Sequence, residues 1–329
     1  MELQEILNTP AKLFLLSKYI RGNTIEDIIN YNGWEQVLGV NPSIYLNQLL
    51  DLGILVTANL KDHLSIKCKN EELRGLLKKR GLQVSGSKDI LLQRLIEADP
   101  DGMRTLVTGL NVYKCSDEAK TIADQYLSAE KDKKQIYEDK ILNALKEGKL
   151  KEACLLRAKN ELCNVFPQPR IYYGQKYSKD QAIASWSDYD TKDDVKRLEL
   201  TIKARPKILS SLNEEQMNRI CFVAALSHFM DKKKYLKTLP DELNKNLLFD
   251  KATAVGMVWF YALHRFNLEQ WRNNINIKQV KILHIKDGLS CDVCNSLNGK
   301  ILNIKDVPEL PNKDCTSIKG CRCEMRPTF

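Results

Sequence analysis

Residues 70–98 read NEELRGLLKKRGLQVSGSKDILLQRLIEA, two short amphipathic segments separated by a turn. Gly81 is expected to end a first helix, and the turn at 85–87 to cap a second. Because a unit this small has little area to bury, its leucines have to be internal. The stretch therefore predicts a helix–extended–helix module over residues 68–105. The apolar residues at helical spacing are Leu73, Leu76 and Leu77 in the first segment, and Ile90, Leu91 or Leu92, and Leu95 in the second.

The turn between the two segments is flanked by basic residues. Its backbone N–H groups lie at the start of the second helix, which is a favourable position for a phosphate. Within residues 71–98, six basic residues stand against four acidic ones, a net charge of +2. This charge predicts a weak, salt-sensitive contact dominated by phosphates. The candidate nucleic-acid-binding residues are Lys78, Lys79, Arg80, Ser85, Gly86, Ser87, Lys88 and Arg94.

This segment resembles the SAP domain, a helix–extended–helix DNA-binding motif. The resemblance rests on the leucine spacing, the turn Arg80-Gly81-Leu82, the junction Ser85-Gly86-Ser87-Lys88 and the end Arg94-Leu95. It implies binding to double-stranded DNA, often AT-rich, that is read by shape more than by individual bases. A helix pair that merely joins two domains would bury similar leucines, and it is the alternative interpretation.

The first 67 residues predict a compact helical unit that ends in a β-hairpin. Thr24 and Asn41-Pro42 are typical helix starts. Two runs that follow, ILVT at 54–57 and HLSIK at 63–67, predict paired strands. This order of helices and hairpin resembles the winged-helix fold. Because residues 1–67 carry five basic and seven acidic residues, we expect this domain to contact protein rather than DNA.

The middle of the chain is predicted to be helical, with one irregular segment. Residues 106–165 have apolar positions at helical period with a single break, which predicts a helical connector. Residues 166–206 are rich in Pro and Tyr and weakly periodic, which predicts a loop or linker. Residues 207–275 contain two strongly apolar helical stretches, the expected core of a helical domain. Ser211 with Glu214 predicts a capping box before the first of them.

Composition restricts the class of protein. The chain has 329 residues, 43% hydrophobic and 28% charged, and a formal net charge of +9, which permits nucleic-acid binding without requiring it. No apolar run approaches the roughly 18 residues of a membrane span, and the N-terminus does not resemble a signal peptide. We therefore expect a cytoplasmic, nucleoid- or virion-associated protein with reduced thiols and no membrane partner. Cys154 and Cys163 lie on apolar helical stripes and are expected to be core thiols.

Five of the ten cysteines lie after residue 290, in a tail predicted over residues 276–329. The run VKILHI at 280–285 predicts a strand that leads into them. In a reduced protein, CxxC followed by further cysteines usually binds metal, and a sulfur-rich tetrahedral site suits Zn²⁺. The first pair is fixed by its spacing, whereas three cysteines compete for the two other positions. The candidate ligands of this structural zinc are Cys291, Cys294, Cys315, Cys321 and Cys323.

The cysteine cluster is also compatible with three arrangements that hold no zinc. Disulfides would require export, and free thiols would make the clustering a coincidence. An iron–sulfur cluster would need four cysteines, but their spacing fits no common pattern. Within a zinc site, His284, in the strand before the cysteines, is an alternative metal ligand.

The tail resembles the C-terminal end of phage Mu F-like minor head (head morphogenesis) proteins. The shared order is a strand, CxxC, a Leu-x-Gly-Lys turn at 297–300, a Pro-containing stretch and a terminal CRC. The histidine that these proteins place before CRC is absent, and Asn312 stands at about its place. Cys315 would then substitute for the imidazole. The resemblance implies a metal-stapled module and suggests a phage-derived or virion-associated role.

Patterns that would indicate catalysis are weak. The sequence has no P-loop, no GxGxxG and no HNH pattern around the cysteines. Asp241, Glu242 and Lys245 resemble a nuclease PD-x-x-x-K motif, but in a helical, apolar setting that does not suit a strand-borne metal site. We expect a mainly α, multi-domain, non-catalytic DNA-binding protein with a small zinc-binding α+β tail, acting within a larger assembly. A virion structural protein and a metal-dependent DNA-processing nuclease are the alternatives.

Overall fold

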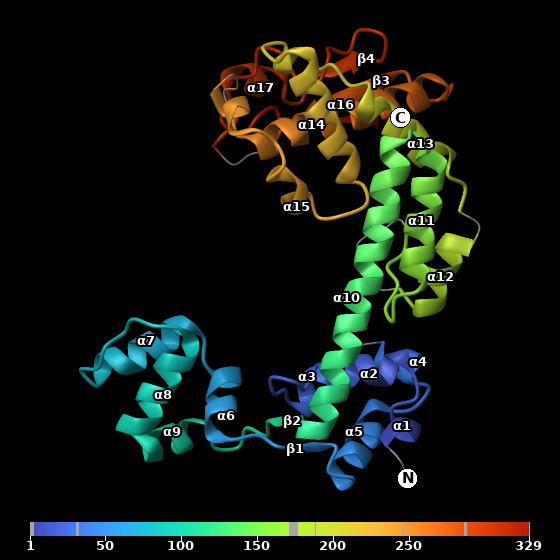
Figure 1. Cartoon of the computed structure of the whole chain (residues 1–329). Helices are drawn as coiled ribbons and strands as arrows, with labels where there is room; N and C mark the ends of the chain where they lie inside the picture. Colours follow the sequence, from blue (N-terminus) through green and yellow to red (C-terminus); the bar gives the residue numbers. More distant parts are fainter. Residues whose placement is uncertain are drawn as a thin grey trace. The chain divides into compact units, whose positions relative to one another are not determined.

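The computed structural model describes residues 3–30, 33–170, 177–187, 189–245, 247, 249–285 and 288–328. The chain is mainly helical, as predicted, with small antiparallel sheets (Figure 1). It divides into two compact units. Unit 1 consists of Met1–Gln135 and Glu161–Asp188, and unit 2 of Ile136–Asn160 and Tyr189–Phe329. None of the described helices combines the length and the apolarity that crossing a bilayer requires.

The N-terminal part of unit 1 is a set of short helices that begin at capping residues. The side chains of Thr9, Thr24 and Asn41 each accept a backbone N–H at the start of the second, third and fifth of these helices. Their apolar faces enclose one core, in which Leu15, Leu16, Tyr19, Leu46 and Leu49 are fully buried. The helices are α1 (Leu3–Ile6), α2 (Pro10–Ser17), α3 (Ile25–Ile29), α4 (Trp34–Leu38) and α5 (Pro42–Asp51).

The predicted hairpin after these helices is wrong. The first run does form a strand, β1 (Leu55–Thr57), but the second forms a helix, α6 (Leu60–Lys67). The side chain of Asn59 accepts the N–H of Asp62 at 2.9 Å and starts a helix where alternation suggested a strand. The antiparallel partner of β1 is β2 (Tyr113–Cys115), much further along the chain. The expected wing of a winged helix is therefore absent from this segment.

Between β1 and β2 the chain forms a helical module with its own core. After α6 come α7 (Asn70–Lys79), α8 (Lys88–Ala98) and α9 (Pro100–Leu106). Gly81, at φ +65°, lies just beyond the end of α7 as predicted. Ile90, expected inside, is 49% exposed, because Leu91 and Leu92 occupy the buried face of α8. The buried residues of this α6–α9 module are Leu64, Cys68, Leu73, Leu77, Leu91, Leu92, Leu95 and Met103.

Two long helices follow, as expected for residues 106–165. They are α10 (Asp117–Lys146) and α11 (Leu150–Leu162), and the break between them contains Gly148 at φ +71°. Cys154 is buried, as expected. Cys163 is exposed, because it lies beyond the end of α11 rather than on its buried face.

The prediction of a loop over residues 166–206 is wrong for much of that segment. Residues 171–176 and 188 lie outside the described residues, and the remainder contains α12 (Lys179–Ser187) and α13 (Lys192–Ile202). The Ser178 hydroxyl accepts the N–H of Gln181 at the start of α12. Acidic residues in the first turn of α13 stabilise the helix by interacting with the positive end of its dipole. These local start signals outweigh the weak apolar period.

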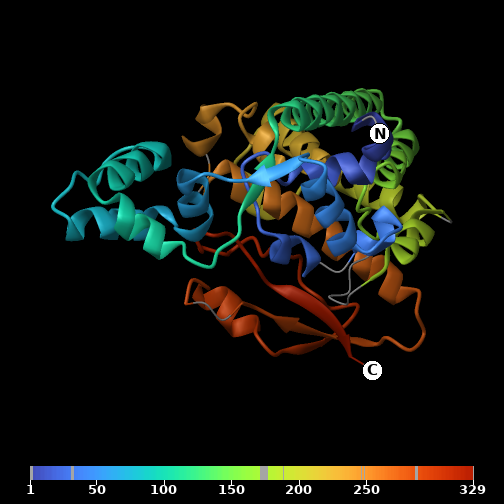
Figure 2. The same ribbon diagram turned by 90° about the horizontal axis from the view of Figure 1, so that it is seen from below.

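Unit 2 continues with helices packed against a small sheet near the C-terminus (Figure 2). The first long helix begins after Asn213, which forms a capping box with Gln216 in place of the predicted Ser211 and Glu214. The elements are η1 (Lys207–Leu209), α14 (Glu214–Leu226), α15 (Lys232–Leu236), η2 (Asp241–Lys245), α16 (Lys251–Arg272), β3 (Gln279–Leu283), α17 (Asp292–Leu297), β4 (Ile301–Asn303) and β5 (Glu324–Thr328).

The sheet holds the cysteine-rich segment against this helical core. Its strand order is β4–β3–β5, and both pairings are antiparallel. Val280, Ile282 and Met325 point inward and share one core with α14 and α16. A Cβ at Gly320 would lie 2.8 Å from Thr253 Cγ2, so the backbone of the loop before β5 approaches α16 closely. This packing fixes the cysteine-bearing loop on the core.

Candidate nucleic-acid interface and metal centre

The turn before α8 presents exposed backbone at a helix N-terminus. Ser85, Gly86 and Ser87 are exposed, and Ser87 is the N-cap residue of α8 without a capping bond from its side chain. Gly86 has φ +130°, and a Cβ there would lie 3.0 Å from Ile90 Cγ2. The turn therefore requires glycine at this position. Its geometry suits an anion held by backbone N–H groups.

Three of the predicted binding cations are held by the α6–α9 module itself. Lys88 Nζ donates to the carbonyl of Ser65 at 2.6 Å. Arg94 Nη1 donates to the carbonyl of Ser85 at 3.2 Å and also to that of Gln83. These two cations and the third, Arg80, are half-buried. They hold the two ends of the turn to the helices rather than projecting into solvent.

The third of these cations, Arg80, ties the end of α7 to the start of α9. Its Nε donates to Asp99 Oδ2 at 2.9 Å, and its Nη1 donates to the carbonyl of Leu76 at 3.1 Å. The Arg80 guanidinium and the N–H of Gly102 lower the pKa of the Asp99 carboxyl. Asp99 in turn caps α9. Arg80 is therefore part of the framework that sets the angle between helices.

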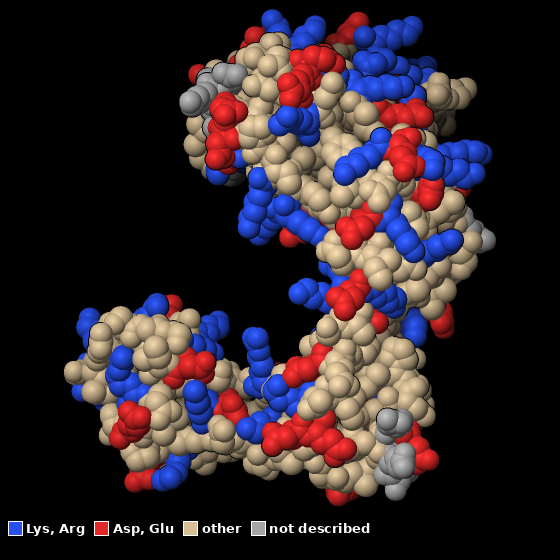
Figure 3. Space-filling model, in the orientation of Figure 1, with Lys and Arg blue, Asp and Glu red and all other residues tan. Residues whose placement is uncertain are grey.

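Among the cations of α7 and α8, the exposed ones lie along α7. Lys78 and Lys79 are exposed, as a direct phosphate contact requires. Arg74 is also exposed and lies four residues before Lys78, on the same face of α7. The sequence interpretation did not select Arg74, although its spacing from Lys78 is the signal that identifies it. Figure 3 shows cationic and acidic side chains interspersed over this module, so the cations available to a ligand form a small patch rather than a broad positive face.

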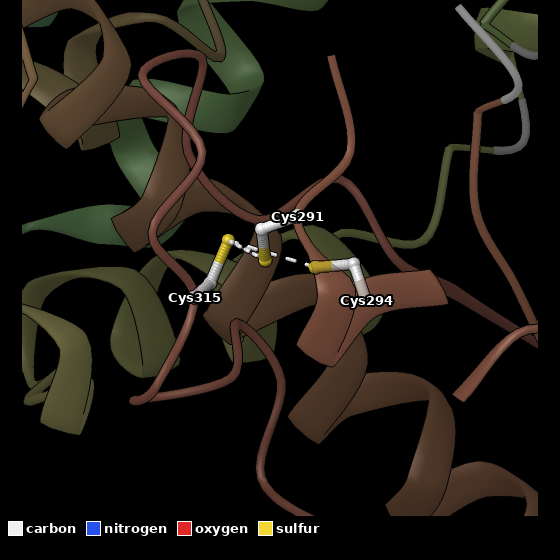
Figure 4. A group of neighbouring side chains, drawn as sticks. All are labelled: Cys291, Cys294 and Cys315. Carbon is white, nitrogen blue, oxygen red and sulfur yellow. Dashed lines mark hydrogen bonds between the residues drawn. The ribbon is translucent and has the colours of Figure 1, made fainter. Parts of the chain in front are cut away.

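The second candidate site is the cysteine cluster of unit 2. Cys291 is the N-cap residue of α17, and Cys294 lies in the first turn of that helix. Cys315 comes from the loop between β4 and β5, and the three sulfurs point toward one another (Figure 4). The Sγ atoms of Cys291 and Cys315 are 3.6 Å apart, and those of Cys294 and Cys315 are 3.5 Å apart. These spacings exceed a disulfide bond and place several soft donors around one point.

The remaining two cysteines join the same cluster through Cys294. Cys321 Sγ lies 3.9 Å from Cys294 Sγ, and the sulfurs of Cys294, Cys321 and Cys323 all lie within 4.8 Å of one another. Cys294, Cys315, Cys321 and Cys323 are buried, and Cys291 is half-buried. The structure therefore brings together all five cysteines that the sequence singled out. Such a set of thiols could hold a metal ion.

The electrostatics of the cluster differ between its members. Burial acts to raise the pKa of Cys291, but backbone hydrogen bonds from Cys294 and Thr316 and nearby thiols lower it to about 6. Burial raises the pKa of Cys294. The Cys321 thiol, followed by burial, raises the pKa of Cys315. Without a cation, the pKa shifts therefore favour the thiolate at Cys291 over those at Cys294 and Cys315, and a divalent metal would favour thiolates at all three.

Two other residues considered for this site do not enter it. His284 Nδ1 contacts the carbonyl of Ile285 at 2.9 Å and the hydroxyl of Ser290 at 3.3 Å, and it belongs to neither group of clustered sulfurs. Asn312 accepts the N–H of Asp314 through its side-chain oxygen at 2.9 Å, and its carbonyl accepts the N–H of Cys315. Asn312 thus shapes the turn that presents Cys315.

The nuclease-like triplet begins on a 3₁₀ helix rather than on a strand. Asp241 belongs to the short 3₁₀ helix η2, and its carboxylate pairs with Lys251 Nζ at 2.6 Å. The Asp241 side chain is 97% exposed. His228 is half-buried, and its removal from solvent lowers the pKa of its imidazole to about 4, which keeps it neutral at physiological pH.

Comparisons with known proteins support the SAP resemblance. The model of the SAP domain family matches residues 68–100, the segment that forms α7 and α8 with their flanks. No curated protein matches the chain, and no solved structure matches it. The resemblance of the tail to phage Mu F-like minor head proteins finds no support among these comparisons. The chain thus contains a SAP domain at residues 68–100, a module that suggests nucleic-acid binding.

Proposed function

We propose that this protein binds double-stranded DNA through the exposed cations of the α6–α9 module, chiefly Lys78, Lys79 and Arg74. The observation that carries this proposal is the SAP domain at residues 68–100. The exposed positions of the three cations on α7 support it further. Cations at this surface bind DNA by neutralising phosphates and releasing counterions, so the complex is expected to be salt-sensitive.

Within this proposal the basic residues divide into two roles. Lys78, Lys79 and Arg74 contact phosphates directly. Arg80, Lys88 and Arg94 act as positioning residues, because their charged groups already bind carbonyls or a carboxylate of the module. They keep the turn at 85–87 in the form that exposes its backbone N–H groups to a second phosphate. The net positive charge is small, so this division matters more than the total charge.

The double variant Lys78→Ala/Lys79→Ala tests this proposal. Removing two phosphate contacts should weaken binding to a duplex. It should also make the negative slope of log K against log salt less steep, by about 2. Fluorescence anisotropy with a labelled duplex, measured between about 50 and 200 mM salt, gives both the affinity and this slope. Lys233→Ala/Lys237→Ala is the matched control, since these exposed lysines lie in unit 2 and the charge change is identical. Equal affinities for both variants would rule out this surface.

We also propose that the cysteine cluster holds a structural Zn²⁺. The sulfur-only donor set, its burial and sulfur spacings of 3.5–3.9 Å support a soft tetrahedral metal over a hard cation. The ion would join α17, the loop between β4 and β5, and the start of β5. Elemental analysis of the purified protein should find about one zinc per chain.

We further propose a non-catalytic role in the cytoplasm within a larger assembly. Ten free thiols, with no disulfide among them, support a reducing environment. Ile44, on α5, is 70% exposed and is a candidate contact with a protein partner. Cross-linking from this position in cells, compared with a cross-linker placed on α15, tests for such a partner.

A further inference from the structure

A hollow of 230 Å³ opens on the surface of unit 1, away from the α6–α9 module. It lies between α2, the first half of α10 and the segment that follows α11, and all of its lining residues belong to unit 1. Most of its walls are apolar side chains that pack on the core of this unit. The lining side chains that bear on a ligand are Phe14, Tyr126, Leu127, Glu130, Val165 and Phe166.

The aromatic walls are held in place by a buried tryptophan. The ring centroids of Phe14 and Phe166 are 5.9 Å apart. Trp34, which is 3% exposed, packs against both rings, with its centroid 5.9 Å from that of Phe14 and 4.8 Å from that of Phe166. Phe14, Phe166 and Tyr126 are themselves half-buried, so part of each ring is open to the surface. A ligand would therefore meet rings that are already ordered, which lowers the entropic cost of binding.

One carboxylate faces these rings from α10. Tyr126 and Glu130 are four residues apart on this helix, and both line the hollow. Burial, followed by the charge of Glu130, raises the pKa of the Tyr126 hydroxyl to about 12, so the phenol is neutral beside the carboxylate. Glu130 Oε1 lies 3.5 Å from Lys133 Nζ, a partly exposed pair of a kind that contributes little. A cation from a ligand can therefore replace Lys133 as the partner of Glu130.

A ring of this group already holds an ammonium group of the chain itself. Lys18 Nζ lies 3.9 Å from the centroid of Phe14, within the range of a cation–π contact. Such contacts become stronger when the cation is partly removed from water, as it would be inside the hollow. The rings of Tyr126 and Phe166 offer the same interaction to a second cation.

Charge decides which side chain suits this hollow. An apolar side chain would fit the walls, but it would remove Glu130 from water without giving it a partner, which is costly. An acidic side chain would be repelled by the same carboxylate. A basic side chain can lay its methylene groups along Leu127 and Val165 and bring its charge to the rings and to Glu130.

We propose that this hollow receives a lysine or arginine side chain of a protein partner. The rings contact the cation, Glu130 pairs with it, and the aliphatic walls cover its stem. This site extends the proposed role in an assembly by stating the chemistry of one contact. It requires neither the proposed DNA contact nor the proposed zinc ion, because its residues belong to the core of unit 1.

Two short peptides with blocked ends test the proposal on the full chain. One carries a single central lysine, and the other has norleucine in its place, which keeps the aliphatic stem and removes the ammonium group. Saturation-transfer NMR titrations should show that the lysine peptide binds more tightly than the norleucine peptide. Glu130→Gln and Tyr126→Leu should each weaken binding of the lysine peptide by roughly 3- to 30-fold, the range expected for loss of a cation contact.

Asp132→Asn is the matched control for Glu130→Gln. Asp132 is exposed on the same helix, and residues two positions apart on a helix do not face each other. This variant removes one negative charge from α10 and should leave the affinity for the lysine peptide unchanged. Circular dichroism with thermal unfolding reports whether Tyr126→Leu, which keeps an apolar side chain at this position, retains the fold.

The possible outcomes distinguish this site from other uses of the hollow. Equal or tighter binding of the norleucine peptide would assign the hollow to an apolar side chain and overturn the proposal. Binding of neither peptide, or equal losses in Asp132→Asn and Glu130→Gln, would overturn it as well. A dimer in analytical ultracentrifugation that Tyr126→Leu dissociates would assign the hollow to a second copy of the chain instead. Affinity for a labelled duplex, measured separately, tests the proposed function and is independent of these results.

Discussion

Arg94 lies half-buried beside the turn that precedes α8, and its guanidinium donates to the carbonyls of Ser85 and Gln83. These bonds cross from one turn of α8 back to the extended segment and hold both ends of the turn. A cation in such a position serves the module before it serves any ligand. Its presence beside the SGSK turn was predictable from the sequence, but its use in holding the turn was not, because that depends on where α8 packs.

Arg94→Ala is expected to destabilise the module more than it weakens a single phosphate contact. Removing Arg94 Nη1, which donates to both carbonyls, leaves the two carbonyls to water and should lower the free energy of unfolding by about 1–2 kcal/mol. Chemical denaturation of the purified protein measures this change. Lys78→Ala is the matched control, because it removes an exposed cation and should change stability by less than about 0.5 kcal/mol. A stability loss of equal size in both variants would refute the positioning role of Arg94.

At the scale of the element, the sequence predicted features set by nearby residues correctly but did not predict strand pairing between distant segments. Capping residues such as Thr24 and Asn41 predicted helix starts correctly, because the signal and its structure are a few residues apart. The partner of β1 is β2, and no local pattern near residue 57 identifies a strand so distant. HLSIK has an alternating sequence, yet Asn59 starts a helix there. Where one apolar pattern fits both the helical and the strand period, the capping residue and the tertiary partner decide which element forms.

The turn before α8 provides a test of backbone geometry at this scale. Gly86→Ala should be destabilising by about 1–2 kcal/mol, because φ is +130° and the added Cβ would meet Ile90 Cγ2 at 3.0 Å. It should also weaken DNA binding, since the turn's N–H groups would move. Gly75→Ala, in the middle of α7 with nothing within 4 Å of the added Cβ, is the matched control. It should stabilise α7 by about 0.5–1 kcal/mol. Thermal unfolding of both variants decides between a required glycine and a tolerated one.

At the scale of the molecule, the two candidate sites belong to different units. The α6–α9 module lies between β1 and β2 of unit 1, and the cysteine cluster belongs to unit 2. The cluster was predictable because CxxC and CRC are local spacings in a protein expected to be reduced. The place of Cys315 was not, because it depends on the fold of the loop between β4 and β5. Each site has its own core, so each is expected to respond separately to damage in the other.

Removal of the proposed zinc ion should therefore unfold part of unit 2 and leave the proposed DNA binding intact. Metal that binds the folded state stabilises it in proportion to the logarithm of metal concentration over Kd, and its removal takes that stabilisation away. A chelator should increase amide hydrogen exchange in α17 and β5, which the proposed ion joins, and in β3, the strand that pairs with β5. Exchange in α7 and α8 should stay unchanged, as should affinity for a labelled duplex measured in the same sample. If the chelator abolished duplex binding without changing exchange in α17, the independence of the two sites would be wrong, because the metal would then act on the α6–α9 module rather than on the fold of the tail.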